Sequence, residues 1–376
     1  MKFELIGSTG NMKTLEEMLK FSQNCARVCY SKEDYADIEK EPLNMELIER
    51  MIKSGHHSVF EHINLTFYIK GIPKILAMIL NNEKQYATSE KSARYTQMSD
   101  IKPEQKEKYD KWMEILIPEI GRVFPRLKDS EEREKSIKKL AQENARYMTS
   151  VFTPTKMVHT VNLRQLNFLI YEFERFREKS QRNSFNNYLS FYMERFLDQV
   201  NWLKVDGLEN QTRRKLSFLS DRIVEEKFGE AYSTSYLMSF AGLAQAHRHR
   251  TINYNISGGT ELEAPLGFFI PDIIPRHLRA EWIMDLREIA ESDFPQAQLV
   301  RVNERGIKED FISKMTLRLC GHTQYEIMEN TLETALNYAE HDQEIKEMLS
   351  TGKPQCTPNG CRGCHWGNRY GINRIV

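Results

Sequence analysis

The chain has 376 residues, and its 53 Lys and Arg residues balance 53 Asp and Glu residues. A chain of this length can bury a large core and hold two or more structural units, and its zero net charge argues against nucleic acid or an anionic membrane as a partner. No stretch approaches the roughly 20 apolar residues of a membrane-spanning helix, the N-terminal segment has no apolar secretory region, and six cysteines are too few for a disulfide scaffold, so we expect a cytoplasmic protein.

Taken in chain order, the elements predict a helix-rich α/β (α+β) fold with an antiparallel-leaning sheet. Alternating apolar residues at 63–70 predict a strand with one buried face, and residues 157–163 are a second extended segment. Helical spacing is found at 14–24, 44–55, 103–150 with a break at Pro125, 164–203, 236–247, from 279, and 306–341. The polar segment around 204–215 indicates a boundary, and no tandem short repeat is present.

Two polar stretches in the first half could carry chemistry. In "SGHHSVFEH", residues 54–62, His56, Ser58 and Glu61 stand just before the predicted strand. In "SEKSARYTQM", Ser92 and Arg94 lie close together, and hydroxyls, loop amides and an arginine can hold a phosphate. A polar turn and a solvated loop are the alternative interpretations.

A third stretch, "QAHRHRTINYNISGG", brings Gln245 together with Arg248, His249 and Arg250. On a continuous helix Arg248 and Arg250 would point about 200° apart, so one ligand could use both only where the helix has ended. The alternative interpretation is that these cations lie at a helix C-terminus, where they interact favourably with the helix dipole.

A fourth stretch, "RLCGHTQYEI", sets Arg318 and His322 at i and i+4 of a predicted helix, with Gln324 nearby. If buried, these polar side chains need partners. Exposure at the surface is the alternative.

The order of these motifs resembles that of the flavin-dependent thymidylate synthases, the thymidylate synthase-complementing family. The similar elements are "CARVCY" at 25–30, "GHHSVFEH" at 55–62, "EKSARY" at 90–95, "TKMVHTVNLRQLNF" at 155–168, "RHR" at 248–250 and "RLCGHTQYEI" at 318–327. The resemblance covers nearly the whole chain before the tail, as two incomplete tandem copies of the family fold.

The resemblance divides the chain into a first copy at 1–205, a second copy at 206–350 and a Cys-rich tail at 351–376. The first copy has Asn82-Glu83-Lys84 where the family has Arg-His-Arg. The second copy has the complete Arg-His-Arg but lacks the FEH element, and it carries Thr260 where the family has an arginine. "FPQAQLVR" at 294–301 is similar to the family's segment that runs from a proline to an arginine, Arg301 here.

The resemblance implies methylation of dUMP to dTMP with FAD as cofactor and with methylenetetrahydrofolate and NADPH as co-substrates. It assigns catalysis to Arg248 and Arg318. The implied substrate-binding residues are Ser92, Arg94, Gln245, Arg248, Arg301, Arg318 and Gln324. The implied flavin-contacting residues are His56, Ser58, Glu61, Asn162, Arg164, His249, Arg250, Asn255 and His322. Because the copies lack complementary motifs, we expect one hybrid site built from both and a homodimer in place of the family's tetramer.

The tail carries a cysteine pattern that the family does not have. Cys356, Cys361 and Cys364 have C-x4-C-x2-C spacing, followed by His365, which predicts zinc with His365 or Cys320 as the fourth ligand, or else an iron–sulfur cluster. A flexible thiol-bearing tail is the alternative. Cys29, between Val28 and Tyr30, is expected to be a packed thiol.

Other functions remain open. The chain could act on a different pyrimidine nucleotide, or be a non-catalytic scaffold that binds flavin or nucleotide. Several potentially buried cations favour a working nucleotide pocket, because an idle scaffold has no need for them. A nucleic-acid binder with a zinc tail is disfavoured by the zero net charge.

Overall fold

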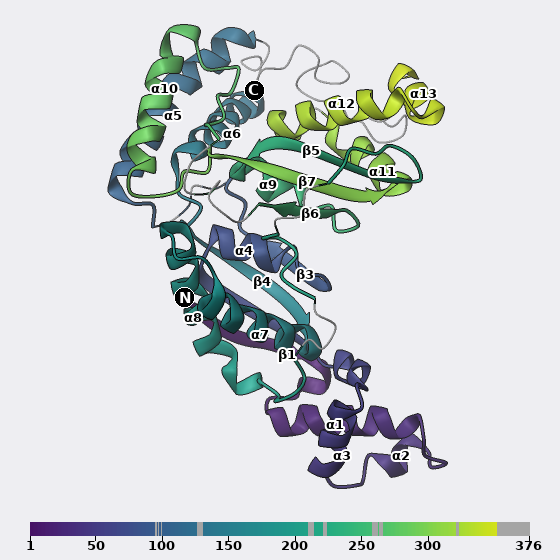
Figure 1. Cartoon of the computed structure of the whole chain (residues 1–376). Helices are drawn as coiled ribbons and strands as arrows, with labels where there is room; N and C mark the ends of the chain where they lie inside the picture. The colour runs from purple at the N-terminus through teal and green to yellow at the C-terminus, as the bar shows by residue number, and fades with distance from the viewer. Residues whose placement is uncertain are drawn as a thin grey trace. The chain divides into compact units, whose positions relative to one another are not determined.

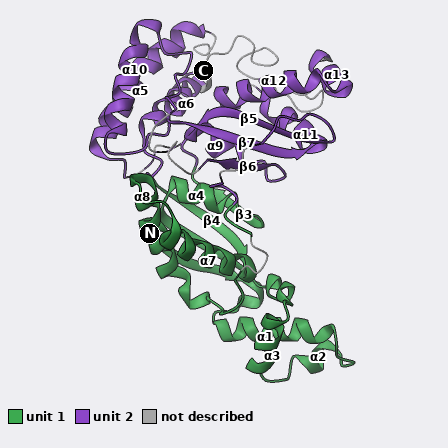
Figure 2. Ribbon diagram, viewed as in Figure 1, with its two compact units in different colours: residues 1–91, 154–216 green, residues 92–153, 217–376 purple. Residues whose placement is uncertain are grey.

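The computed structural model describes the chain apart from residues 95, 97, 99, 126–130, 210–213, 221–223, 258–261, 263–265, 321–322 and 352–376. It forms two compact units (Figure 2). Unit 1 comprises residues 1–91 and 154–216, and unit 2 comprises 92–153 and 217–376. The two units are defined by contacts within the fold. The division at residues 205 and 350 separates the two copies predicted from the sequence, and it stays a prediction.

Unit 1 is built on a four-stranded antiparallel sheet in the order β1-β2-β4-β3 (Figure 1). Its strands are β1 (Lys2–Ser8), β2 (Asn64–Pro73), β3 (Tyr86–Glu90) and β4 (Pro154–Asn162). Its helices are α1 (Leu15–Val28), α2 (Tyr35–Ile38), α3 (Met45–Lys53), α4 (Lys74–Leu80), α7 (Leu163–Lys179) and α8 (Ser184–Val200), with 3-10 turns η1 (Thr9–Asn11), η2 (His57–His62) and η5 (Asn201–Leu203).

Sequence patterns account for these elements. Leu65, Phe67 and Ile69 of β2 are buried while the residues between them are partly exposed, which confirms the predicted strand and its face. Helix α1 begins with a capping box in which Thr14 and Glu17 satisfy each other's backbone N–H groups. The predicted helices at 14–24 and 44–55 and the predicted strand at 157–163 are likewise confirmed.

Unit 2 contains a three-stranded antiparallel sheet in the order β5-β7-β6. Its strands are β5 (Ala231–Ser239), β6 (Asn253–Ile256) and β7 (Leu299–Ile307). Its helices are α5 (Pro103–Val123), α6 (Glu131–Ala145), α9 (Phe240–Ala246), α10 (Arg279–Ala290), α11 (Lys308–Arg318), α12 (Tyr325–Ala339) and α13 (Gln343–Thr351), with 3-10 turns η4 (Arg146–Met148) and η7 (Arg276–Leu278).

Apolar cores form in two places among the described residues of unit 2. One lies among α5, α6 and α10, where the rings of Trp112 and Trp282 meet edge to face with centroids 4.8 Å apart. The indole of Trp112 donates to Asp285 at 2.8 Å. The other core packs α11 and α12 around Phe311 and Tyr338.

Two helix predictions in the second half are wrong in part. The segment 236–247 begins as strand β5, and the helix starts only after Ser239, whose hydroxyl accepts from the N–H of Gly242 and so caps α9. The single helix predicted over 306–341 is two helices, α11 and α12. Between these two helices the N–H of Thr323 donates to the carbonyl of Cys320 at 2.9 Å. Gly321 follows Cys320 in the sequence, and glycine is a residue type that weakens helices.

The two units share one order of elements. In unit 1, β2, α4, β3, β4 and α7 follow one another, and in unit 2 β5, α9, β6, β7 and α11 do so. The last strand of each series lies between the other two. Asn82 follows the end of α4 by two residues, as Arg248 follows the end of α9. Positions 82–84 and 248–250 therefore occupy equivalent turns.

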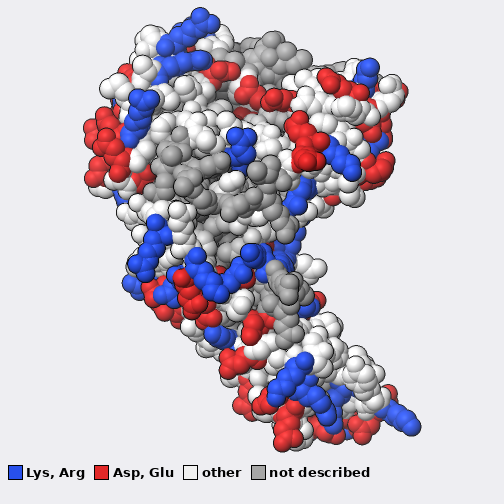
Figure 3. Space-filling model, viewed as in Figure 1, with Lys and Arg blue, Asp and Glu red and all other residues white. Residues whose placement is uncertain are grey.

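Surface charge is mixed. On the face in Figure 3, Lys and Arg side chains are interspersed with Asp and Glu side chains over most of the surface. In the part of the chain that the structure describes, no helix combines the length and the apolar character needed to cross a membrane.

Candidate functional site

Two arginines from distant segments, Arg94 and Arg248, come within electrostatic reach of a third, Arg318, in unit 2. Arg94 follows β3 in sequence, Arg248 follows α9, and Arg318 ends α11. Burial lowers the pKa of Arg318, and the positive charges of Arg248 and Arg94 lower it further, against a partial offset from Tyr254. We call Arg94, Arg248 and Arg318 the arginine cluster. Like charges gathered this way form a ready site for an anion.

Buried polar atoms beside the cluster lack partners within the described residues. They are Nε of Arg318, Oε1 of Gln245 and Nε2 of His249. Arg318 does make one bond, from Nη2 to the carbonyl of Gln245 at 3.3 Å. Because an unsatisfied buried polar group costs free energy, these atoms suit a polar ligand.

The end of α9 positions Gln245 and His249. The helix closes at Ala246, and His249 N–H bonds to the Ala246 carbonyl in the following turn. Arg248 and Arg250 therefore lie beyond the helix, and both are exposed. Burial, with the positive charges of Arg318 and Lys314, lowers the pKa of His249 to about 3, so its imidazole is neutral at neutral pH.

A buried network adjoins the cluster and contains a residue that sequence reasoning missed, Arg146. Its Nη2 donates to the carbonyl of Ala241 at 3.1 Å and to Oε1 of Gln324. Gln324 Nε2 donates to the hydroxyl of Tyr147 at 2.7 Å, and that hydroxyl donates to Glu326 at 2.8 Å. Predicted substrate residue Gln324 is thus held in place by protein groups.

Arg146 belongs electrostatically with the cluster. Burial lowers its pKa, Glu143 opposes that effect, and the charge of Arg94 adds to it. Arg94 itself forms an ion pair with Glu143. An arginine between the apolar residues Ala145 and Tyr147 was the sequence signal that could have identified it, because a cation in such a run needs partners.

A second buried ion pair lies deeper in unit 2. Lys314 Nζ is 2.6 Å and 2.8 Å from the two oxygens of Glu304, and both side chains are almost fully buried. The hydroxyls of Tyr232 and Tyr236 donate to the same carboxylate at 2.7 Å and 2.5 Å. The positive charge of Lys314 is one of the causes that lower the pKa of His249.

Three other site residues predicted in unit 2 are Arg301, Asn255 and Ser92. Arg301 is exposed on β7, and strand alternation puts it on the face opposite Glu304. Asn255 is buried on β6 and donates to the carbonyl of Ser220 at 3.0 Å. Ser92 accepts a turn bond from Thr96 N–H through its backbone carbonyl.

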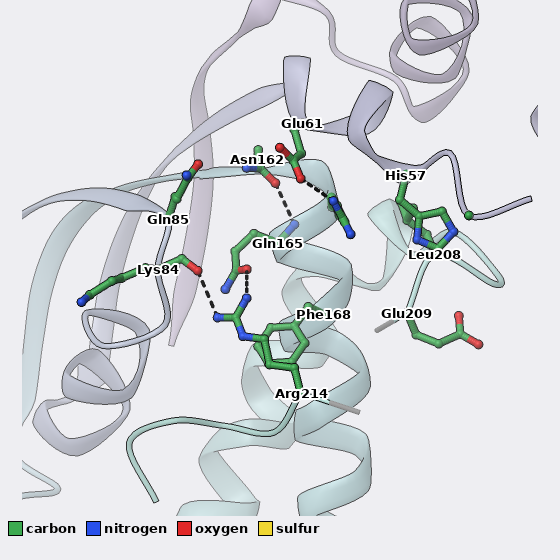
Figure 4. A pocket seen from close by; sticks show the side chains of 12 residues that line it. His57, Glu61, Lys84, Gln85, Asn162, Gln165, Phe168, Leu208, Glu209 and Arg214 are labelled. Atoms are coloured by element: carbon green, nitrogen blue, oxygen red, sulfur yellow. Dashed lines mark hydrogen bonds and ion pairs between the residues drawn. The ribbon is translucent and has the colours of Figure 1, made fainter. Parts of the chain in front are cut away.

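Unit 1 holds a cavity of about 400 Å³, which we call the linker cavity (Figure 4). It is lined by Gly55, His57, Glu61, Lys84, Gln85, Asn162, Arg164, Gln165, Phe168, Leu208, Glu209 and Arg214. Three residues of the predicted flavin set are among them. Arg164 pairs with Glu61 at 2.6 Å, and Asn162 Oδ1 accepts from Gln165 N–H at 2.8 Å as the cap of α7.

His56 lines a neighbouring, more open cavity of about 920 Å³, formed by α1 and α3 with Arg27, Tyr30 and Arg50. The Tyr30 and His56 rings meet edge to face with centroids 6.0 Å apart. Gly55 borders both cavities. Ser58 is exposed on η2.

The expectation of a packed Cys29 thiol is wrong. Cys29 is exposed at the end of α1, because the helix stops there and Val28 is exposed beside it. His322 and the tail ligands Cys356, Cys361, Cys364 and His365 lie outside the described residues. Among the residues that are described, no group of three His, Cys, Asp or Glu side chains is arranged for a metal ion. Helix α11 ends at Arg318, and the predicted i, i+4 pairing of Arg318 with His322 falls on a residue outside the described part of the chain.

Comparison with known proteins identifies similar sequences. A family model described as thymidylate synthase complementing protein matches residues 12–183. The flavin-dependent thymidylate synthase of Wolinella succinogenes is 30% identical over 159 residues, covering 40% of this chain and 77% of that protein. The enzymes of Clostridium tetani and Pseudothermotoga lettingae are 25% and 31% identical over 165 and 140 residues, or 39% and 35% of this chain. The chain spans 66% and 63% of the length of these two relatives.

Solved structures give weaker likenesses. A UMP/dUMP methylase, PolB from Streptomyces cacaoi bound with 5-Br dUMP, is 18% identical with a TM-score of 0.33 and covers 54% of this chain and 91% of that chain. Thymidylate synthase X from Helicobacter pylori with FAD and dUMP is 17% identical with a TM-score of 0.32, covering 55% and 99%. Scores this low carry no argument about this chain.

Proposed function

Because the chain belongs to the flavin-dependent thymidylate synthase family, we propose that it methylates a pyrimidine nucleotide, dUMP, at C5. One observation carries the proposal. The positive charges of Arg94 in the SARY segment and of Arg248 in the Arg-His-Arg motif both act on Arg318 in unit 2 and lower its pKa. In sequence these residues belong to different copies, so the arginine cluster supports a hybrid nucleotide site.

The chain's own residues suit a nucleotide monophosphate. Its phosphate is a dianion near neutral pH, and Arg94 and Arg248 offer guanidinium groups that hold phosphate with charge-assisted hydrogen bonds. Arg318, half-buried at the end of α11, would sit by the uracil and stabilise the negative charge that develops on the ring oxygens when C6 is attacked. Gln245 Oε1 and neutral His249 Nε2 supply buried hydrogen-bonding atoms for the base or the cofactor.

The residues also fit FAD, which in its reduced form supplies a hydride. The linker cavity combines a polar wall, Glu61, Asn162 and Arg164, with the apolar ring of Phe168. A volume of about 400 Å³ is within the range of ligand pockets, so it would take part of the cofactor. We assign methylenetetrahydrofolate as one-carbon donor and NADPH as reductant.

We further infer that the working site combines halves from the two copies. We call Glu61, Asn162 and Arg164 of the linker cavity the flavin corner. The equivalents of Asn162 and Arg164 where β7 ends and α11 begins are Ile307 and Glu309, so unit 2 lacks this Asn–Arg pair. Unit 1 has lost Arg-His-Arg at 82–84. Each chain would thus contribute one flavin corner and one arginine cluster, in a homodimer of soluble, cytoplasmic protein.

The test is direct. Purified protein is incubated with FAD, dUMP, methylenetetrahydrofolate and NADPH, and thymidylate is measured, with each component omitted in turn. Thymidylate that depends on all four supports the proposal. Protein that binds FAD and dUMP but releases no methylated product would be a scaffold, and product from UMP instead of dUMP would reassign the substrate.

The tail proposal is separate. We propose that Cys356, Cys361, Cys364 and His365 bind zinc, or an iron–sulfur cluster, in a structural role, because a closed thiolate-rich site leaves no open position for substrate. Elemental analysis should find near-stoichiometric metal that disappears when Cys361 and Cys364 become Ser. Metal-free wild type after anaerobic, chelator-free purification contradicts it.

A further inference from the structure

Unit 2 has a cavity at the position equivalent to the linker cavity of unit 1. Its volume is about 570 Å³, and it lies where β7 ends and α11 begins. Counted from the starts of α4 and α9, Thr251 is the equivalent of Gln85. Counted from the starts of α7 and α11, Asp310 is the equivalent of Gln165. Both glutamines line the linker cavity, and both of their equivalents line the cavity of unit 2, which we call the second cavity.

The second cavity has a different lining from the linker cavity. Ile307 stands where unit 1 has Asn162, and its aliphatic side chain offers a ligand no hydrogen bond. Arg305 stands where unit 1 has Thr160, so this wall carries an additional cation. The second cavity therefore lacks a residue of the flavin corner and has gained a charge, which favours a ligand other than flavin.

Arg305 lies in a row of three residues across the sheet of unit 2. Strand β7 runs between β5 and β6 (Figure 1), and in register Arg305 is flanked by Ser233 and Asn253. All three residues line the second cavity. The Nε of Arg305 is buried and has no hydrogen-bond partner in the described part of the chain. Because a buried donor without a partner costs free energy, this atom suits an acceptor supplied by a ligand.

Charges of opposite sign line the second cavity without pairing. Lys227 comes from the segment before β5, where two backbone hydrogen bonds of 2.9 Å join it to Ser233. Asp310 comes from the first turn of α11. Within the described residues, neither the Asp310 carboxylate nor the Arg305 guanidinium forms an ion pair. Separated charges of this kind suit a ligand that is an anion at one end and a hydrogen-bond donor at the other.

We propose that the second cavity binds a nucleoside monophosphate. Such a ligand carries both groups, because its phosphate is a dianion near neutral pH and its sugar has hydroxyls that donate hydrogen bonds. Arg305 and Lys227 hold the phosphate through charge-assisted hydrogen bonds, and Asp310 accepts from a sugar hydroxyl. The volume of about 570 Å³ is within the range of pockets for small ligands.

The second cavity is separate from the arginine cluster. Asp310 and Arg318 belong to the same helix, α11, and a separation of eight residues at 1.5 Å each corresponds to about 12 Å. No arginine of the cluster is among the described residues that line the second cavity. The inference therefore goes beyond the proposed function, because it adds a nucleotide site that is not the place of methylation.

The experiment titrates full-length protein with dUMP in a calorimeter and compares the wild type with Arg305→Ala, Arg318→Ala and the control Arg276→Ala. Arg276 is exposed and is not among the described lining residues, so the control removes a positive charge of unit 2 without changing either site. Thermal unfolding checks each variant. If Arg305→Ala is unstable, Arg305→Gln keeps a polar side chain at the position. Deoxyuridine and FAD are titrated as further probes.

We expect the wild type and Arg276→Ala to bind two dUMP molecules per chain. Arg305→Ala should weaken one of them about tenfold or more, the scale of losing a charged hydrogen bond, and Arg318→Ala should weaken the other. Deoxyuridine should bind the second cavity more weakly than dUMP, and FAD affinity should not change in Arg305→Ala.

The outcomes separate this inference from the proposed function. One dUMP per chain that only Arg318→Ala weakens overturns the second site and leaves the proposed function intact. One dUMP that only Arg305→Ala weakens supports the second site and contradicts the arginine cluster as the substrate site. Deoxyuridine that binds the second cavity as tightly as dUMP overturns phosphate recognition. Weaker FAD binding in Arg305→Ala would mean that the second cavity holds the cofactor, and this too overturns the inference.

Discussion

Replacing His159 should remove a large part of the acid sensitivity of folding. His159 is in β4, between Phe67 of β2 and Thr88 of β3 in register, and its side chain is 3% exposed. Its ring stacks on Tyr86 at 5.6 Å between centroids, and neither ring nitrogen has a partner among the described residues. Burial lowers its pKa to about 4.

The magnitude follows from linkage. An unfolded histidine has a pKa of about 6.5. Between pH 6.5 and 4 the unfolded chain therefore binds a proton that the native chain refuses, and the free energy of unfolding falls as the pH falls. At about 1.4 kcal/mol per pH unit, a depression to about 4 removes about 3 kcal/mol of stability across this window. Above pH 6.5 the effect is absent.

The assay is urea unfolding followed by circular dichroism from pH 7 to pH 4. His159→Phe keeps a ring against Tyr86 and cannot be protonated, so its loss of stability over the window should be smaller than that of wild type by about 3 kcal/mol. His62→Gln, at an exposed side chain, controls for the removal of a histidine. Parallel pH profiles for wild type and His159→Phe would refute the reasoning.

Two further perturbations test unit 2. Arg94→Ala and Arg318→Ala should each weaken dUMP binding, measured by calorimetry, by about 1.5–3 kcal/mol, the scale of one charged hydrogen bond. The control Arg276→Ala, at an exposed side chain, should leave dUMP binding unchanged. Unchanged binding in both Arg94→Ala and Arg318→Ala would mean that these arginines are not part of the site. Lys314→Met should lower the free energy of unfolding by about 3–5 kcal/mol, because it leaves the buried Glu304 carboxylate without its partner. The double variant Lys314→Met/Glu304→Gln should recover part of this loss. A Lys314→Met variant as stable as the wild type would contradict the prediction.

Helices and strands could be predicted from the sequence where the periodicity of apolar residues was strong. Strand β2 and helices α1, α3 and α10 were predicted from spacing, since one buried face imposes it. Strands β1, β3, β5, β6 and β7 were missed. The residues of β3, Tyr86–Glu90, are few and mostly polar, so they gave no apolar alternation, and pairing to β4 is what makes them a strand.

From the sequence, the candidate site could be identified only as separate motifs. Arg94 and Arg318 were named from sequence because they match family positions. Arg146 was missed because its partner Gln324 is 178 residues away, and Arg214 was missed because Glu83 is 131 residues away. Contacts across such separations depend on the path of the chain, which local composition does not determine.

The repeated order of elements bears on how a hybrid site could arise. Strands β3 and β4 pair Ala87 with Thr160, and β6 and β7 pair Asn253 with Arg305. Counted from the start of α4 and α9, and of α7 and α11, these pairs hold equivalent positions, so the two units share a register as well as an order. Register is set by which side chains face the core, and unrelated sheets have no reason to agree in it. We therefore infer duplication, after which each copy could lose the half-site that the other retained. Glu83, at the position equivalent to the histidine of Arg-His-Arg, pairs with Arg214.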